Sequence, residues 1–379
     1  MADRHYIDIH ILQTVPPANL NRDDQGNPKE AYFGGVRRSR VSSQAWKRAT
    51  RKAFTEQIPE EDLATRTKRI AGELAKRLAA RTGLDSESAA RIADAILEPL
   101  GIKTGKKAGD TAYLLFFGRR QLEDIVDLVA DRAAELADMD DKALTAVAKT
   151  LPVEEKLKAG HPIDVALFGR MVAEIPSLNV DAATQVAHAL STHATELEFD
   201  YYTAVDDQNE KDETGAGMIG TVGFNSATLY RYATVSLHQL QENLGEPEKA
   251  VEAIGVFVNA FARSVPSGHG NSFAHRTLPS LVAVAVREDQ PVNLVSAFER
   301  PVSPTSDLGI AGASAQRLAR EQIQVVRQWG DEPSYTAITH MFETDQEPGT
   351  TLKEAFGSPV TFPKLLSGLE NYLSGVVKR

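Results

Sequence analysis

The sequence predicts an α+β fold in which a helical insertion interrupts a body of mixed strands and helices. In YIDIHIL, apolar residues alternate with Asp8 and His10, which is the period of a half-buried strand. Two segments, Pro59 to about Leu100 and Gln121 to Leu151, are dense in Ala, Leu, Arg and Glu at helical spacing. After His193 the pattern changes to strands mixed with helices. The helices therefore form an insertion into a strand-containing body.

The first half of the chain is predicted to contain a long loop, a short strand and two further helices. Residues 14–35 are rich in Pro, Asn, Asp and Gly and predict a long loop. The run TAYLLFFG predicts a strand that separates the two helical segments. Two further helices are predicted, over Asp164–Glu174 and over Asp181–His193, with Asp181 near the N-cap.

The second half begins with two β-rich arms, LEFDYYTAVDD and TVGFNSATLYRYATVSL, separated by a polar, glycine-rich tip. This pattern predicts a long hairpin over about residues 199–235. The segments that follow are, in order, a helix over Pro247–Ala262, the loop SVPSGHGNSFAHRTLP, a buried strand LVAVAVRE, a helix over Ile310–Trp329, a strand YTAITHMF and a short terminal helix.

The composition of the 379 residues excludes several classes of function. Cysteine is absent, so disulfides, thiolate zinc sites and cysteine nucleophiles are excluded. The N-terminus carries Asp3 and Asp8 where a signal peptide needs an apolar core, and no run is long enough to span a bilayer. We therefore expect a cytoplasmic protein that does not contact membranes. The formal net charge of -10 confines any nucleic-acid surface to a local patch.

One local patch is strongly basic. The stretch Gly34–Lys52 contains seven Lys or Arg residues and no acid. If Ser42 or Ser43 is the N-cap, the helix that follows has two distinct faces. The polar face carries Gln44, Lys47, Arg48 and Arg51, and the opposite face carries Ala45, Trp46, Ala49 and Ala53. We expect Trp46 to dock the helix and backbone N–H groups near Ser42 and Ser43 to offer a phosphate site.

The polar face of this helix has two interpretations. A solvated surface is the simpler one. Like charges stacked within two turns repel each other by a few tenths of a kcal/mol per pair. Further basic residues precede the helix, and Gln and Ser beside Lys and Arg suit sugar and phosphate contacts. The sequence therefore favours a surface that binds a nucleic-acid backbone.

Several long blocks of the chain resemble a known family. They are LNRDDQGNPKEAYFGGVRRSRVSSQAWKRATRK, ALFGRM, HALSTHATELEFDYYTAVDD and SGHGNSFAHRTLPS. Together they strongly resemble CasC, the family of backbone subunits of type I-E CRISPR Cascade complexes, within the CRISPR-associated RAMP superfamily. The resemblance extends over nearly the whole chain.

The resemblance implies an RRM-like (ferredoxin-like) palm, a helical fingers insertion and a β-hairpin thumb. We expect residues 1–55 and 181–379 to form the palm, and 56–180 the fingers. Copies of such a subunit stack head to tail along one CRISPR RNA, together with other Cascade subunits. The implied function is non-catalytic: the subunit polymerises along the guide, kinks it into short segments and presents it for pairing with target DNA in antiviral defence.

The same resemblance implies the residues that contact RNA. Seven match the palm contacts to the guide backbone: Arg22, Lys29, Ser42, Gln44, Lys47, Arg48 and Arg51. Arg37 and Arg38, which precede the helix, are included in the predicted RNA-binding set. Met171 resembles a side chain that packs against a displaced nucleotide, and Met218 and Ile219 resemble the wedge that kinks the guide. Asn271 is predicted to bind either RNA or a neighbouring subunit.

One departure from the expected pattern concerns the approach to the hairpin tip. DYYTAVDDQNEKDETG is acidic, whereas a segment that grips nucleic acid should be basic. We interpret it as an exposed connector or as a face toward a basic partner.

A second lysine-rich segment, GIKTGKKAGDT, departs from the phosphate-binding loop of nucleotide hydrolases. Gly101 and Gly105 are one residue too close together, and Lys107 is followed by Ala. Lys103, Lys106 and Lys107 are tentative DNA contacts, with a solvated loop as the alternative.

The alternative function is a RAMP-type endoribonuclease that processes CRISPR RNA, with His269 or His275 as acid or base. Asp23 and Asp24 are the other candidates for catalysis, because RAMP relatives in type III complexes use a loop acid. The histidine spacings match no standard zinc pattern, so we expect no metal and no cofactor.

Overall fold

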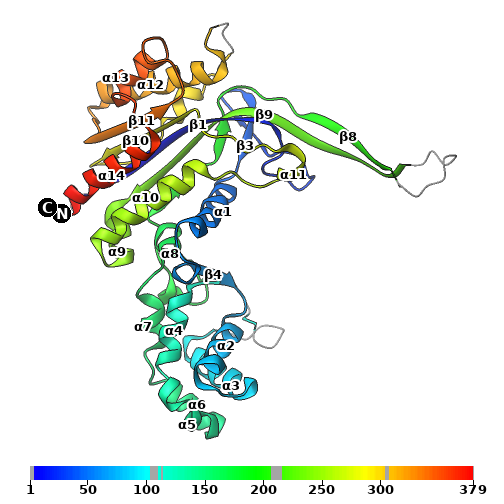
Figure 1. Ribbon diagram of the computed structural model, residues 1–379, viewed down its shortest axis with the longest axis vertical. Coiled ribbons are helices and arrows are strands. Elements are labelled where there is room, and N and C mark those ends of the chain that lie inside the picture. Colours follow the sequence, from blue (N-terminus) through cyan, green and yellow to red (C-terminus); the bar gives the residue numbers. More distant parts are fainter. Residues whose placement is uncertain (1–3, 103–109, 112–113, 206–215, 304–306, 379) are drawn as a thin grey trace. The chain divides into compact units, whose positions relative to one another are not determined.

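The computed structural model describes residues 4–102, 110–111, 114–205, 216–303 and 307–378 (Figure 1). The chain divides into two compact units. Unit 1 comprises Met1–Phe54, Gln185–Ser236 and Ile254–Arg379, and unit 2 comprises Thr55–Thr184 and Leu237–Ala253. Unit 2 contains the predicted fingers insertion. It also includes Leu237–Ala253, which we expected in the palm.

Unit 1 is built on one antiparallel sheet with the strand order β11-β10-β1-β9-β7-β3-β2, and β6 and β8 also pair with β9. Its strands are β1 (Tyr6–Ala18), β2 (Glu30–Phe33), β3 (Val36–Val41), β6 (Thr184–Val186), β7 (Ala189–Ser191), β8 (Glu198–Val205), β9 (Ala216–Ser236), β10 (Leu281–Arg287) and β11 (Tyr335–His340). Its helices are α1 (Ser43–Ala53), the second half of α10 (Pro247–Arg263), α11 (Gly270–Phe273), α12 (Gly309–Trp329), α13 (Gly349–Phe356) and α14 (Phe362–Val377).

The centre of this sheet has ferredoxin-like topology. The four strands β10-β1-β9-β7 lie side by side, with α1 between β1 and β7 in the chain and α10 between β9 and β10. This is the β-α-β-β-α-β arrangement in which every neighbouring pair of strands is antiparallel. The predicted α+β class and RRM-like palm are confirmed.

Strand β1 is buried on both faces, although its alternating sequence predicted a half-buried strand. Ile9 and Ile11 point to one face, and Asp8 and His10 are equally buried on the other. Asp8 accepts hydrogen bonds from Nε of Arg287 at 3.0 Å and from the hydroxyl of Tyr232 at 2.8 Å. These partners lie on β9 and β10, far from Asp8 in the sequence. The alternation of polar and apolar residues in β1 therefore could not show that the polar face of this strand is also buried.

The layer that covers this polar face consists mainly of α12 and α13. Leu12 and Tyr230 of the sheet form one apolar cluster with Leu318 of α12 and with Leu352 and Phe356 of α13. The opposite face receives α1 and α10. The sheet therefore lies between two layers of helices.

Helix α1 docks through Trp46, as the sequence predicted. The indole is fully buried, and the guanidinium of Arg231, from β9, lies 3.7 Å from its ring centroid. Phe261 of α10 meets the indole edge to face. Arg231 also donates to Oε1 of Gln13 at 2.6 Å, and burial lowers its pKa to about 9. A buried cation thus attaches the basic helix to the sheet.

Two predicted segments adopt other structures. Residues 14–35 were predicted as a loop, but β1 continues to Ala18 and β2 begins at Glu30. The helix predicted over Asp181–His193 is wrong, because this segment forms β6 and β7. Strand β7 pairs with both β3 and β9, so pairing with distant segments overrides its local helical pattern.

The predicted hairpin is confirmed as β8 and β9. The strands are antiparallel, with Glu198 opposite Phe224 and Thr203 opposite Ile219. Figure 1 shows the pair extending beyond the rest of the sheet. Beyond this arm, β9 continues along β1 from Asn225 to Ser236, so the hairpin and the central sheet share one continuous strand.

Unit 2 is mostly helical. Its elements are β4 (Ala64–Thr67), α2 (Ile70–Thr82), α3 (Ser86–Leu97), β5 (Leu115–Gly118), α4 (Arg119–Asp127), α5 (Ala133–Asp138), α6 (Asp141–Ala148), α7 (Val153–Lys158), α8 (Ile163–Phe168), α9 (Leu237–Leu244) and the first half of α10. The apolar faces of α2 to α7 enclose one core. Helix α8 is shorter than the predicted Asp164–Glu174 because it ends at Gly169, with φ of 74°.

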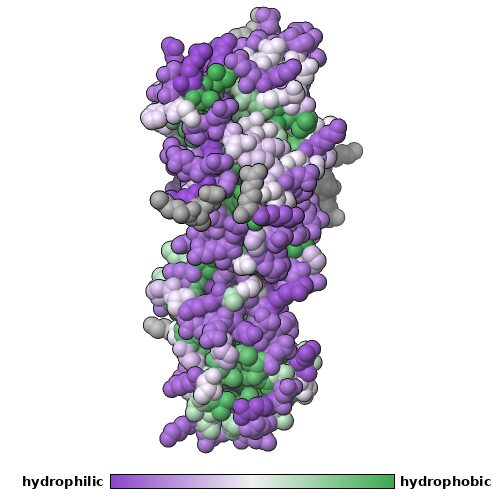
Figure 2. Space-filling model, turned by 90° about the vertical axis from the view of Figure 1, so that its left-hand side faces the viewer, coloured by the Kyte–Doolittle hydropathy of each residue, from purple (hydrophilic) through white to green (hydrophobic). Residues whose placement is uncertain are grey.

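The surface in Figure 2 is largely hydrophilic, with hydrophobic residues gathered near the lower end, in the helical unit. Within the described ranges, the helices all fall short of the length and apolarity required to cross a membrane.

Candidate nucleic-acid interface

The polar face of α1 is partly exposed. Gln44 and Arg48 are exposed, whereas Lys47 and Arg51 are half-buried. Burial lowers the pKa of Lys47. Arg48 forms no ion pair with any acid of the described residues. The predicted separation into an indole face and a cationic face is therefore present, with Arg48 as its most open cation.

The N-terminus of α1, where the sequence predicted a phosphate site near Ser42 and Ser43, is partly engaged by the protein itself. The N–H of Ser42 donates to Oδ1 of Asn21 at 2.9 Å, and the N–H of Ser43 donates to Nδ1 of His188 at 3.3 Å. The hydroxyl of Ser42, which is buried, accepts the N–H of Ala45. The N–H groups of Ser42 and Ser43 are therefore engaged within the chain, and the contact of Ser42 with RNA stays a prediction.

His188 acts as an acceptor here because its environment keeps the imidazole neutral. Burial lowers the pKa of His188, and the nearby charges of Arg40 and Lys29 lower it further. His188 is an exposed residue that holds the first turn of α1 against β3.

Arg38 is buried, which contradicts its predicted contact with RNA. Its guanidinium donates to four backbone carbonyls, those of Phe33, Ser191, Phe298 and Glu299. Burial lowers the pKa of Arg38. The residue therefore joins β3 to β7 and to the segment around residue 298, and it is inaccessible to a ligand.

Arg37 is exposed but engaged. It donates to Oε2 of Glu30 at 2.6 Å, and its guanidinium carbon lies 5.4 Å from the ring centroid of Tyr32. Arg40, the third arginine of β3, donates to the carbonyl of Glu30 at 3.1 Å. The cations of β3 are thus largely used inside the protein.

The loop before β2 places Arg22 and Lys29 beside this region. Asp23 shapes the loop, because its Oδ1 accepts the N–H groups of Gln25 and Asn27, each at 2.9 Å. The guanidinium of Arg22 lies 3.3 Å from Nε2 of His269. Arg22 is exposed and Lys29 is half-buried, so both can reach a ligand.

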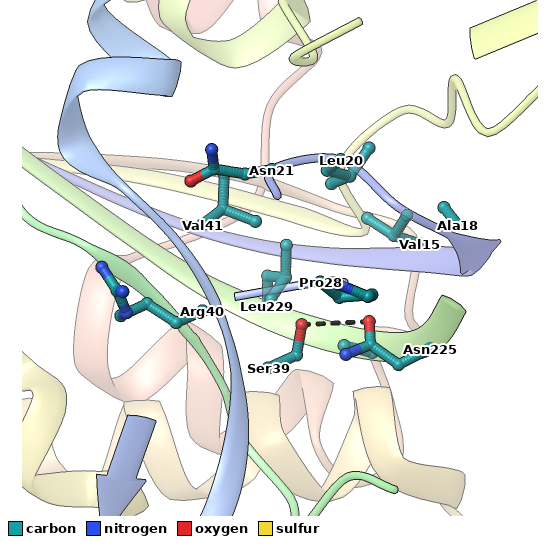
Figure 3. Close-up of a pocket in the computed structure, with 11 residues that line it drawn as sticks. Val15, Ala18, Leu20, Asn21, Pro28, Ser39, Arg40, Val41, Asn225 and Leu229 are labelled. Carbon is teal, nitrogen blue, oxygen red and sulfur yellow. Dashed lines mark hydrogen bonds between the residues drawn. The ribbon is translucent and has the colours of Figure 1, made fainter. Parts of the chain in front are cut away.

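A small pocket lies under this loop (Figure 3). Ser39 and Asn225 face each other in it, and the Ser39 hydroxyl donates to Oδ1 of Asn225 at 3.2 Å. Asn225 Nδ2 is buried without a partner among the described residues. The cavity measures about 10 Å³, the room that one water molecule needs. This cavity is therefore too small to hold a nucleotide.

The segment carrying Asn271 lies beside Arg22. Asn271 is exposed on the short α11, between His269 and Ala274, whose φ angles are 49° and 45°. Phe273 anchors this turn against Phe224 of β9, with ring centroids 5.9 Å apart. The fold thus brings together two predicted contacts, Arg22 and Asn271, that are far apart in sequence.

The remaining predicted residues lie elsewhere. Met171, in unit 2, is 84% exposed and directly follows Arg170, whose buried guanidinium donates to the carbonyls of Leu157 and Leu178. Met218 and Ile219 pair through their backbones with β8, but their side chains fall outside the described residues. Lys103, Lys106 and Lys107 also lie outside them.

Sequence reasoning missed three exposed aromatic residues. Tyr32 on β2 is 72% exposed, and Phe199 and Tyr201 on β8 are 60% and 63% exposed. Phe199 and Tyr201 are two residues apart, so both side chains lie on one face of the hairpin. Their aromatic character inside a polar arm was the signal available in LEFDYY.

Two of the four candidate catalytic residues, Asp23 and His275, have structural roles, whereas Asp24 is exposed. His275 is buried, and its Nε2 bonds to the carbonyl of Pro266. In the described part of the chain, no three His, Asp or Glu side chains are grouped so that they could hold a metal ion.

Comparisons with known proteins agree with this geometry. Residues 7–367 match the family described as CT1975-like protein. A chain of a solved structure entitled "CRISPR RNA-guided surveillance complex, pre-nicking" is 34% identical, with a TM-score of 0.83 over 97% of this chain and 100% of that chain. A chain from a "CRISPR RNA-guided surveillance complex" is 30% identical, with a TM-score of 0.73 over 97% and 99%. No curated protein matches the sequence. The chain therefore belongs to the CT1975-like protein family.

Proposed function

We propose that this chain is a CRISPR RNA-binding backbone subunit of a surveillance complex of type I-E, in the manner of CasC. The observation that carries the proposal is the outward cationic face of α1, with Arg48 open to solvent. Arg22 and Lys29 extend this cationic surface from the neighbouring loop. The titles of the two similar structures name RNA-guided surveillance complexes, which supports the same role.

The chemistry of this surface suits a nucleic-acid backbone. Arg and Lys neutralise phosphates whatever the base, and Gln44 adds a hydrogen-bonding group for sugar or phosphate oxygens. Such contacts hold a guide in place without reading it. Sequence recognition then falls to base pairing between the guide and target DNA.

The proposal includes assembly of successive copies along the guide. Met171 is the exposed side chain that would pack against a displaced nucleotide. Phe199 and Tyr201 on the hairpin are aromatic side chains that a free monomer leaves in water. Contacts between different patches of successive copies would cover them and propagate as a filament in the cytoplasm. In this proposal Met218 and Ile219 wedge apart the guide bases, as the resemblance implies.

The alternative, an endoribonuclease, has less support. His275 is buried, and Asp23 is occupied by two backbone N–H groups. His269 is engaged by Arg22 at 3.3 Å. General acid or base catalysis needs a group within reach of the substrate, and His275 and Asp23 serve the fold. Asp24 is exposed, so it is the remaining carboxylate that the alternative could use.

A nuclease-protection experiment tests the proposal. The purified protein is incubated with labelled CRISPR RNA without metal, and the mixture is then treated with an added nuclease. We expect intact RNA before treatment and protected fragments of regular length after it. Discrete cleavage products before treatment would contradict a scaffold and favour the endoribonuclease.

Replacing Ile219 with Gly should retain RNA binding and alter the spacing of the protected fragments. An unaltered spacing would refute the role of Ile219 as a wedge.

A further inference from the structure

Tyr32 is an exposed aromatic residue whose ring has a built support on one side. Tyr32 on β2 lies opposite Arg37 on β3, so their side chains share one face of the hairpin. The Arg37 guanidinium carbon lies 5.4 Å from the ring centroid, and Glu30 holds that guanidinium at 2.6 Å. Glu30, two residues before Tyr32, lies on the same face. The ring is nevertheless 72% exposed.

The hairpin that carries the ring is held firmly. Its turn contains Gly34, with φ of 61°, and a Cβ there would lie 1.5 Å from the carbonyl oxygen of Glu299. Only glycine permits this approach. The buried guanidinium of Arg38 adds hydrogen bonds to Phe298 and Glu299. Tyr32 therefore projects from a rigid edge, which lowers the entropy lost when a ligand stacks on it.

The charges around the ring indicate what it binds. Arg37 is paired with Glu30, and the hydrogen bonds that its guanidinium donates to the side chains of Glu30 and Tyr32 raise the pKa of Arg37. A guanidinium already paired with a carboxylate is a poor phosphate contact, but it is a good planar support for an aromatic ring. The Glu30, Tyr32 and Arg37 group is thus nearly neutral and aromatic, unlike the cationic surface next to it. This composition suits a planar, weakly charged group such as a nucleobase.

The position of the ring also favours RNA. Tyr32 is three residues beyond Lys29, a span of about 10 Å in an extended strand. The backbone N–H of Arg40 donates to the carbonyl of Lys29 at 2.9 Å, so Lys29 is fixed beside the strand that leads into α1. Lys29 and Tyr32 are three positions apart, so their side chains leave opposite faces of the extended segment. Because β2 is the edge strand of the sheet, an RNA strand that meets Lys29 and α1 can bring a base to Tyr32 by passing around this edge.

We propose that Tyr32 stacks on a nucleobase of the bound RNA and that Arg37, held by Glu30, is a positioning residue behind the ring. This inference rests on the proposed RNA-binding function. It changes the role of Arg37 from a phosphate contact to a support for Tyr32. Stacking accepts any base, so the contact is independent of sequence.

The test uses single-stranded RNAs that carry 2-aminopurine at successive positions, titrated with the full-length protein at several salt concentrations. Stacking quenches 2-aminopurine. Tyr32→Ala should weaken binding about five- to hundredfold, abolish quenching at one position and leave the salt slope unchanged. Tyr32→Phe should behave like the wild type, because it keeps the ring.

Two further variants serve as comparisons. Trp329→Ala removes another aromatic side chain, 83% exposed at the end of α12, and should leave RNA binding unchanged. Arg37→Gln should reduce the quenching while the salt slope stays within error. A slope flattened by about 0.7 would instead make Arg37 a phosphate contact and overturn its positioning role.

Each other outcome is decisive. Equal affinity and equal quenching for Tyr32→Ala and the wild type would overturn the inference and leave the proposed function intact. Unchanged RNA binding with weaker self-association by sedimentation velocity would assign Tyr32 to a protein interface and overturn it too. If the wild-type protein binds no RNA, the proposed function itself fails. The urea unfolding midpoint of each variant confirms that it is folded.

Discussion

The two halves of the basic stretch Gly34–Lys52 differ in how their cations are used. In the strand half, Arg38 is buried, Arg37 is paired with Glu30, and Arg40 is bonded to backbone. In the helical half, Arg48 faces solvent and the indole of Trp46 faces the core. The same residue types, a few positions apart, therefore hold the fold together in one half and present a surface in the other.

The difference comes from secondary structure and its surroundings. Strand β3 lies between β2 and β7, so Arg38 points into protein, where backbone carbonyls need donors. Helix α1 rests on the sheet by one side only, which leaves its other side for cations. A count of positive charges thus indicates a nucleic-acid surface only after each charge has been placed on an element.

The largest expected effect is on the buried arginine. Arg38→Met should lower the free energy of unfolding by about 3 kcal/mol or more, because four carbonyls, two of them in buried hydrogen bonds, lose their donor. Urea unfolding measures this loss. Arg48→Ala, which removes the same charge from the surface, should change stability by less than about 0.5 kcal/mol. Equal losses in the two variants would break the contrast between the two halves.

Acid should lower the free energy of unfolding, because His10 is buried beneath α12 and α13 as a neutral imidazole. Burial lowers the pKa of His10 to about 3, so the folded state keeps it neutral while the unfolded state takes up a proton below about pH 6.5. The share of stability linked to His10 is complete above pH 6.5 and falls by about 1.4 kcal/mol per pH unit toward pH 3.

The matched variant for this prediction is His10→Gln, compared with the wild type by urea unfolding between pH 7 and pH 5. The variant should show a shallower loss of stability as the pH falls. An identical pH dependence in the two proteins would mean that another group carries the effect.

The cap of α1 should matter for stability and leave RNA binding unchanged. Ser42→Ala removes the acceptor for the N–H of Ala45 and should lower the free energy of unfolding by about 1 kcal/mol. Because the hydroxyl accepts a hydrogen bond within the protein, the affinity for RNA at fixed salt should not change. Ser43→Ala is the control. A weaker affinity for folded Ser42→Ala, with Ser43→Ala unchanged, would support Ser42 as an RNA contact.

The smallest effect on stability should accompany the clearest effect on binding. Arg48→Ala should weaken RNA binding similarly for all sequences and flatten the plot of log K against log salt by about 0.7. Lys353→Ala removes an exposed cation from α13 and should leave that slope unchanged. If the two variants give the same slope, α1 is not the RNA-binding surface.

Much of the fold was predictable because long elements repeat their period many times. The hairpin β8–β9, the buried strand β10 and helices α10 and α12 all follow from local patterns. Strand β7 was not predictable, because it is three residues long and gains its structure from β3 and β9. A local pattern carries no information about such distant partners.

Some properties of the candidate site were also predictable from local patterns, and others were not. The exposure of Gln44 and Arg48 follows from the helical period alone. The engagement of Arg38 depends on Ser191 and Phe298, 153 and 260 residues away, and the N–H of Ser43 depends on His188. These partners meet only in the folded chain, so neither the basic stretch nor the resemblance could show that Arg38 is engaged within the protein.

An RRM reads RNA with the open face of its sheet, where aromatic side chains meet the bases. Here α12 and α13 cover that face, and Asp8 and His10 are enclosed beneath them. That covered face therefore cannot read bases in the manner of an RRM. Under the proposed function, sequence is read by pairing between guide and target, so a different guide needs no change in the residues of this sheet.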